Sequence, residues 1–224
     1  MKMMNYAVIA SALCAGGALG DTIDLNYQEI AGGSSATTLR INGAQSDAGH
    51  MIHLIESGAQ AGSSFRTFCV EIAEVASVGS ATYDIVGVAD APNPGAPYGQ
   101  AVADRVSAIV ANAAALGWID GHLQADENQA GYLGKMGAIQ AAIWEAVGGT
   151  LSLNSSQTSD ELAFYYLALM DAQSFDDSLR MRNLRAVVAP GQQDMLYVVP
   201  LPPAAWAGAG LLAVGFGVRT LRRR

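Results

Sequence analysis

The sequence predicts an α+β domain, a β-sandwich or barrel with a helical insertion, between two hydrophobic ends. The 224-residue chain has strand-like alternation over residues 21–90, helical spacing over 98–173 and a strand-like pair of runs over 183–199. Hydrophobic residues make up 51% of the chain and charged residues 14%. Such a composition can bury a core, which excludes a generically disordered protein.

Five segments before residue 91 have the alternation of strands and are separated by turns rich in Gly, Ser and Asp. They span residues 21–30, 37–42, 50–56, 65–72 and 82–88. The stretch that follows is rich in Pro and Gly, which break regular structure. We therefore place a loop between the strands and the helical region.

Beyond this loop, apolar residues recur at helical spacing. Helices are expected over residues 102–116, 126–133, 136–147 and 160–172, the last of them capped by Ser159. Two further strands, over 183–189 and 195–199, flank Pro190-Gly191 and predict a terminal hairpin.

The charge distribution indicates an exported protein that does not bind nucleic acid. The chain has 12 basic and 20 acidic residues, a formal net charge of −8, which disfavours binding to a polyanion. Five of the 12 basic residues lie at the two ends, Lys2 at the start and four arginines at the end, whereas every acidic residue lies between Asp21 and Asp194. Lys135 is the only lysine of this acidic body, residues 21–199.

Residues 1–20 have the pattern of a secretory signal peptide. Lys2 supplies a positive start, an apolar run follows from Tyr6 to Leu13, and small residues precede Asp21. The alternative is a buried N-terminal helix, which does not account for these flanks. We expect cleavage near Gly20.

Residues 200–224 form a second hydrophobic end with a basic terminus. The uncharged run 201–218 is about 27 Å long as a helix, close to the length needed to cross a bilayer. The terminal arginines would hold its end on the cytoplasmic side. A C-terminal core helix is the alternative, but it leaves those arginines unexplained.

This tail resembles a PEP-CTERM sorting signal of the VPLPA type, although Leu201 stands where the usual motif has Glu. The matching residues are Val199, Pro200, Leu201, Pro202, Trp206, Arg222, Arg223 and Arg224. The resemblance implies a Gram-negative host and an exosortase, a membrane protease that removes the tail while the protein is transiently in the inner membrane. It also implies delivery to the cell surface or an extracellular matrix, with a role in adhesion or biofilm.

Cys69 is the one cysteine that remains after removal of a signal peptide containing Cys14. An intramolecular disulfide is therefore excluded. A lone exported thiol is buried and inert, paired with another chain, or used chemically.

Two segments around this thiol resemble the Cys-Gln thioester domains of bacterial surface adhesins. They are Phe68-Cys69-Val70-Glu71 and, about seventy residues later, Ile139-Gln140-Ala141-Ala142-Ile143-Trp144. The resemblance implies that Cys69 is the thiol and Gln140 the acyl donor, with Glu71 and Trp144 supporting the site. Ile139 stands in place of the family's Thr, and Glu71 in place of Asp.

The chemistry of such a pair follows from the residue types. Attack of the Cys69 thiolate on the Gln140 carboxamide releases ammonia and leaves an internal thioester. Because amides are poor acyl donors, the two groups must be held together and the oxyanion must be hydrogen-bonded. We expect Gln140 early in its helix, near free backbone N–H groups. The expected partner is an amine-bearing surface protein or an exopolysaccharide.

Two alternatives remain open at this stage. One is a non-reactive matrix protein in which Cys69 and Gln140 only pack together. The other is a Cys–His hydrolase that uses His50 or His122. His50 and His53 should point to opposite faces of a strand, so we expect no metal ion, and no motif indicates a cofactor.

Overall fold

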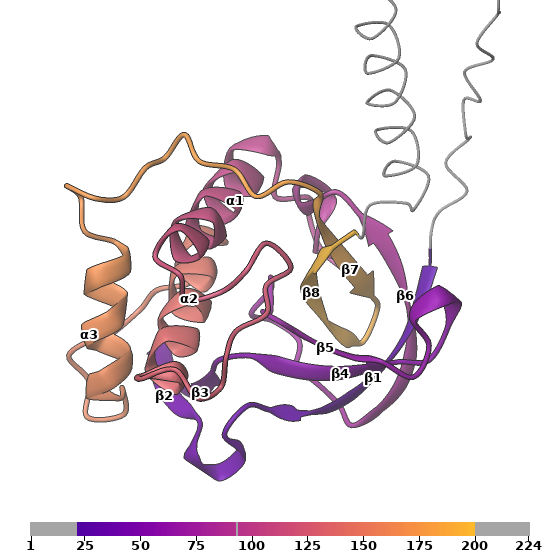
Figure 1. Ribbon diagram of the computed structural model, residues 1–224, viewed down its shortest axis with the longest axis horizontal. Helices are drawn as coiled ribbons and strands as arrows, with labels where there is room; N and C mark the ends of the chain where they lie inside the picture. The colour runs from indigo at the N-terminus through magenta and orange to yellow at the C-terminus, as the bar shows by residue number, and fades with distance from the viewer. Residues whose placement is uncertain (1–21, 93, 200–224) are drawn as a thin grey trace, which may run out of the picture.

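The computed structural model describes residues 22–92 and 94–199 and confirms the α+β class. A curled sheet, close to a half-barrel, lies on one side of the domain and three helices lie on the other (Figure 1). The predicted signal peptide and all of the sorting tail except Val199 lie outside the described residues.

Six antiparallel strands form the sheet in the order β5-β4-β1-β6-β7-β8. Their bounds are β1 Thr22–Ile30, β4 Met51–Ile55, β5 Ser64–Thr67, β6 Gly79–Val86, β7 Leu184–Ala189 and β8 Gln192–Val198. The predicted terminal hairpin is confirmed as β7–β8, with a tight turn at Gly191. The three helices are inserted between β6 and β7.

The two edges of the sheet meet just after β5. Leu196 N–H donates to Phe68 O at 2.9 Å, and Val70 N–H donates to Asp194 O at 2.9 Å. Cys69 and Met195 form an antiparallel bridge between these two bonds. The sheet therefore curls until β8 lies beside the residues that extend β5.

A separate hairpin, β2 Thr37–Ile41 with β3 Ala44–Ala48, contains a strand that the sequence analysis missed. Asn42 and Gly43 connect the strands at φ 49° and φ 82°. Two successive residues with positive φ form a type I′ turn, for which Asn-Gly is the preferred sequence. That dipeptide was the available signal for β3, whose mostly exposed residues have no apolar alternation.

The helices are α1 Gln100–Ala115, α2 Tyr132–Ala146 and α3 Asp160–Leu169. The expected helix over 126–133 is wrong, because turns occupy most of that segment and α2 begins only at Tyr132. Asp126 accepts a hydrogen bond from Asn128 N–H at 2.9 Å, so its side chain stabilises a turn instead. Helix α3 also ends earlier than expected, at Leu169.

Helix α2 packs closely against the β2–β3 hairpin, and Gly137 makes this approach possible. A Cβ atom at Gly137 would overlap the Thr37 hydroxyl and lie 3.2 Å from Ala48 O. Thr37 Oγ1 itself donates to Ala48 O at 2.8 Å. Ser159 precedes α3 as expected, but its hydroxyl accepts the Thr38 N–H rather than a helix N–H.

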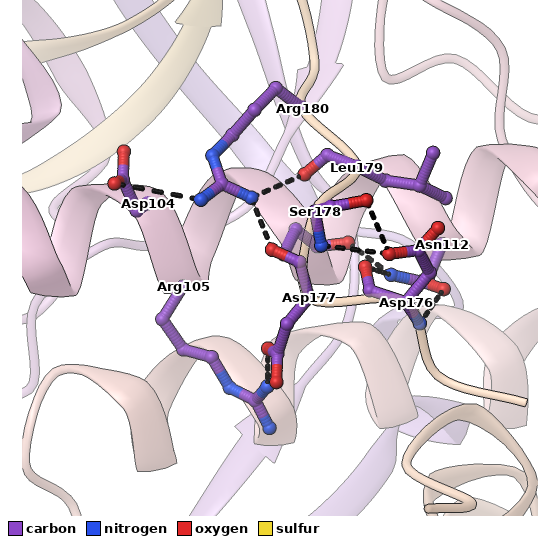
Figure 2. A network of polar contacts seen from close by, with 9 residues as sticks. Asp104, Arg105, Asn112, Asp176, Asp177, Ser178, Leu179 and Arg180 are labelled. Carbon is purple, nitrogen blue, oxygen red and sulfur yellow. Dashed lines mark hydrogen bonds and ion pairs between the residues drawn. The ribbon is translucent and has the colours of Figure 1, made fainter. Parts of the chain in front are cut away.

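The loop between α3 and β7 is fastened to α1 by a polar network (Figure 2). The Asn112 carboxamide donates to Asp176 O at 2.9 Å and accepts from Asp176 N–H at 3.0 Å. Ion pairs join Arg105 to Asp177 and Arg180 to Asp104. Among residues 22–92 and 94–199, no helix is long and apolar enough to cross a bilayer.

Candidate functional site

Cys69 lies where β5 continues between two layers of side chains. Thr67, Phe68, Cys69 and Val70 are all buried, so both faces of this segment are covered. Because neighbouring residues of a strand point to opposite faces, Cys69 shares a face with Thr67. The backbone N–H and C=O of Cys69 point away from β8. They face the edge along which β4 pairs with β5 as far as Thr67.

Gln140, in the middle of α2, places its carboxamide on that open edge. Cys69 N–H donates to Gln140 Oε1 at 2.8 Å, and Gln140 Nε2 donates to Cys69 O at 2.9 Å. Only 1% of Gln140 is exposed. The two residues expected to meet are therefore in contact, through two hydrogen bonds between the carboxamide and the Cys69 backbone.

The expected position of Gln140 near the start of its helix is wrong. Helix α2 begins at Tyr132, so Gln140 is in its third turn and far from the free N–H groups of the first turn. The donor to its carbonyl oxygen comes from the sheet instead, as the N–H of Cys69. This is the type of donor that stabilises an oxyanion at that oxygen.

The sulfur of Cys69 is protected from solvent and remains a thiol at neutral pH. Burial, with a further contribution from the charge of Glu71, raises the pKa of Cys69 far above its usual range. Cys69 Sγ contacts Met51 Sδ at 2.8 Å. Any nucleophilic reaction of this thiol therefore needs a proton acceptor.

Glu71 and Trp144 lie beside this pair, as the resemblance implied. Trp144 Nε1–H donates to Glu71 O at 2.9 Å, which connects α2 to the chain just beyond Cys69. The Glu71 side chain accepts from Glu74 N–H at 2.6 Å. Burial is the main cause that raises the pKa of this carboxyl group, and the nearby charge of Glu74 raises it further.

A cavity of about 320 Å³ opens beside Cys69 and Gln140. Both residues line it, together with Met51 and Trp144. Its other walls come from β1, the β2–β3 hairpin, Gly49, the segment after Cys69 and the start of β8. The volume of this cavity is at the lower end of the range for small-molecule sites. A small molecule could thus reach the Cys69–Gln140 pair through it.

The double hydrogen bond between a carboxamide and a backbone residue recurs twice in the described residues. Gln124 Oε1 accepts from Arg66 N–H at 3.2 Å, and Gln124 Nε2 donates to Arg66 O at 3.0 Å. Asn112 binds Asp176 in the same way. The arrangement itself is therefore structural, and the pair at Gln140 differs in having a thiol and a cavity beside it.

The contacts of the buried histidines, His50 and His53, are with residues other than Cys69. His50 Nδ1 lies 3.2 Å from Tyr132 Oη, and the His50 ring packs on Phe68. The His53 ring packs between Tyr27 and Phe65, while His122 is exposed in a loop. In the described part of the chain, the sulfur of Cys69 is hydrogen-bonded to Met51 and not to a histidine.

Lys135, the lysine of the acidic body, lies away from the Cys69–Gln140 pair. Its Nζ donates to Gln129 Oε1 at 3.1 Å and lies 5.6 Å from the centre of the Tyr165 ring. No group of three or more potential metal ligands is present among the described residues.

Three residues near the thiol were not found from the sequence. Met51, Glu74 and Gln193 line the cavity, but they come from different elements and belong to no motif. Only the folded sheet brings them next to Cys69. A methionine or glutamine alone gives no sequence signal for a site.

No protein-family model matches the chain, and neither the curated proteins nor the solved structures contain a match.

Proposed function

We propose that this chain is an exported surface or matrix protein that uses an internal Cys69–Gln140 thioester to attach covalently to an amine-bearing partner. The observation that supports this proposal is the pair of hydrogen bonds between the Gln140 carboxamide and the Cys69 backbone. They hold the acyl carbon next to the residue that carries the thiol. The adjoining cavity gives a nucleophile access to the same place.

Thioester formation follows from these contacts. The Cys69 sulfur attacks Cδ of Gln140, a C–S bond forms and the C–N bond breaks. The thiol proton leaves with the amide nitrogen as ammonia. Cys69 N–H, already hydrogen-bonded to Oε1, stabilises the negative charge that develops on that oxygen. The nearby charge of Glu71 raises the pKa of the Cys69 thiol.

Attachment is a second acyl transfer to a partner. The amine nitrogen attacks the thioester carbon, the C–N bond forms and the C–S bond breaks. Cys69 returns to a thiol, taking up a proton that the amine loses. The reaction occurs once per molecule, so the protein acts as a covalent adhesin rather than as a turnover enzyme.

The two hydrophobic ends support the route by which the protein reaches its partner. We propose that residues 1–20 direct export, and that the tail 200–224 holds the chain in the inner membrane until an exosortase-type protease removes it. The sequence pattern Val199-Pro200-Leu201-Pro202, the apolar run and Arg222–Arg224 support this part of the proposal. The destination is the cell surface or an extracellular matrix, with a role in adhesion or biofilm.

A non-reactive matrix protein of the same fold is the second candidate. The equivalent bonds of Gln124 with Arg66 and of Asn112 with Asp176 favour it, since neither of these pairs contains a thiol. The contact between the Cys69 and Met51 sulfur atoms favours it as well. In this candidate, Gln140 only satisfies the backbone of a strand edge.

Intact mass spectrometry of the mature protein, purified after removal of residues 1–20 and therefore without Cys14, separates the two candidates. A thioester lowers the mass by one ammonia relative to the sequence, and this deficit must vanish in both Cys69→Ala and Gln140→Ala. Gln124→Ala is the matched control, because it removes an equivalent carboxamide and must keep the deficit. A wild-type protein with the full mass and one free thiol would leave only the non-reactive candidate.

A further inference from the structure

The walls of the cavity beside Cys69 have an uneven chemistry. Its acidic residues are Asp47, on β3, and Glu74, and none of its lining residues is a lysine, arginine or histidine. Asp47 is exposed and Glu74 is half-buried. The negative charge of the cavity is therefore not balanced by a basic side chain within it.

Two hydrogen-bond acceptors on these walls lack a protein partner. Glu74 Oε1 accepts from Gly191 N–H at 2.9 Å, but the buried Oε2 has no hydrogen-bond partner. Gln193 is 8% exposed and donates through Nε2 to Glu71 O at 3.3 Å. Its Oε1 takes part in no hydrogen bond with the residues that the structure describes, although the side chain lines the cavity.

A buried acceptor without a partner, as Glu74 Oε2 is, is costly unless something donates to it, whereas Gln193 Oε1 is a second acceptor on the same walls. A primary ammonium group has three N–H donors and one positive charge, so it suits a carboxylate and an amide oxygen together. The apolar side chains of Ile30, Ile41 and Ile72 also line the cavity and are suited to contact with an alkyl chain. A neutral alcohol offers one donor and no charge, and an anion would be repelled.

We infer that this cavity is a binding site for a primary alkylammonium group, with Glu74 and Gln193 as its hydrogen-bond acceptors and Asp47 as the charged residue at its rim. The inference extends the proposed function, because an amine held here would lie beside the acyl carbon of Gln140. Binding itself does not need the thioester. The two ideas can therefore be tested separately.

The test measures the binding of cadaverine to the full chain carrying Cys69→Ala, in which no thioester can form. Isothermal titration calorimetry should detect one cadaverine per chain. Glu74→Gln keeps the acceptor for Gly191 N–H but removes the charge, and should weaken binding about tenfold, as expected for the loss of a charge-assisted contact. Gln193→Met should weaken it by a similar factor, and Asp47→Asn by less, with a reduced dependence on salt.

Two controls separate recognition from general attraction to an acidic protein. Asp84→Asn removes one exposed carboxylate outside the cavity and should leave the affinity unchanged. Choline carries a positive charge without N–H donors and should bind much more weakly than cadaverine.

Equal binding of choline and cadaverine, or no effect of Glu74→Gln and Gln193→Met, would overturn the ammonium site. So would a Cys69→Ala protein that folds, as judged by circular dichroism, but binds no cadaverine. None of these results bears on the thioester, which the mass deficit of the wild-type protein decides. A missing deficit together with cadaverine binding would instead reject the proposed function and retain this site.

Discussion

The carboxamide of Gln140 completes the backbone hydrogen bonding of Cys69 where β4 no longer runs beside the strand. On the β4 side, Thr67 pairs with Met51, and the next position on that edge belongs to Cys69. There the N–H and C=O of Cys69 bond to Gln140 as they would to a neighbouring strand. Gln124 does the same for Arg66 on the opposite edge, at the position that precedes the residues paired with β8.

This relationship predicts unequal costs for losing the two glutamines. In a Cys69→Ala background, Gln140→Leu leaves a buried N–H and a buried C=O without partners and should lower the free energy of unfolding by about 2–4 kcal/mol. Gln124→Leu exposes the half-buried Arg66 backbone to water and should cost less than about 1.5 kcal/mol. Urea denaturation measures both values. Equal costs would show that the buried edge at residue 69 is not special.

The alternation of apolar residues was enough to predict most strands, and helical spacing was enough to predict the position of α1. What failed had local causes. β3 lies behind an Asn-Gly turn and has little apolar character, and the polar bonds of Asp126 replace the helix expected there. These features depend on turn geometry and side-chain hydrogen bonds, which periodicity does not detect.

The meeting of Cys69 with Gln140 could be predicted only from two short motifs. The geometry of the contact between Cys69 and Gln140 could not be predicted in this way. The start of α2 at Tyr132 depends on the tertiary packing of residues such as Tyr132 and Met136, which are both buried. Gln193 and Glu74 reach the cavity because the edges of the sheet come together. No pattern within a single segment contains that information.

Replacement of Gly137 tests the close packing of α2 on the β2–β3 hairpin. A methyl group at this position overlaps the Thr37 hydroxyl, so Gly137→Ala should lower the free energy of unfolding by about 1–3 kcal/mol despite the better helix propensity of Ala. Gly121→Ala is the control, because a Cβ there meets open space. Thermal or urea denaturation compares the two, and a stabilised Gly137→Ala protein would contradict the described packing.

The polar network in Figure 2 predicts that Asn112 holds the loop before β7 more firmly than the ion pairs do. Asn112→Ala removes both bonds to Asp176 and should cost about 1–3 kcal/mol, since Asn112 is buried. Arg180→Gln breaks a partly exposed ion pair with Asp104 and should cost less than about 1 kcal/mol. Hydrogen exchange over residues 171–183 should accelerate in the first variant and change little in the second.

His53 predicts a loss of stability in acid. Burial lowers the pKa of His53 from 6.5 to about 4, so the folded protein holds this ring neutral. The resulting stabilisation is complete above pH 6.5 and is lost as the pH falls through about 4, with a contribution of up to about 3 kcal/mol. His53→Phe should flatten the fall of the unfolding free energy in this range, whereas a variant of the exposed His122, His122→Phe, should not.

The raised pKa of Glu71 predicts that the free energy of unfolding also changes with pH in the opposite direction. Burial raises the pKa of Glu71 in the folded protein above the unfolded value of 4.5, so between these two pKa values the folded state binds more protons than the unfolded state. The free energy of unfolding should therefore fall as the pH rises above 4.5, until the folded pKa is passed. Glu71→Gln keeps an acceptor for Glu74 N–H but cannot ionise, so it should remove this slope and be more stable than wild type at neutral pH. Asp84→Asn, at an exposed carboxyl group, is the control. A Glu71→Gln protein that is less stable than the wild-type protein at pH 7 would mean that the ionised carboxylate is stabilised by its surroundings.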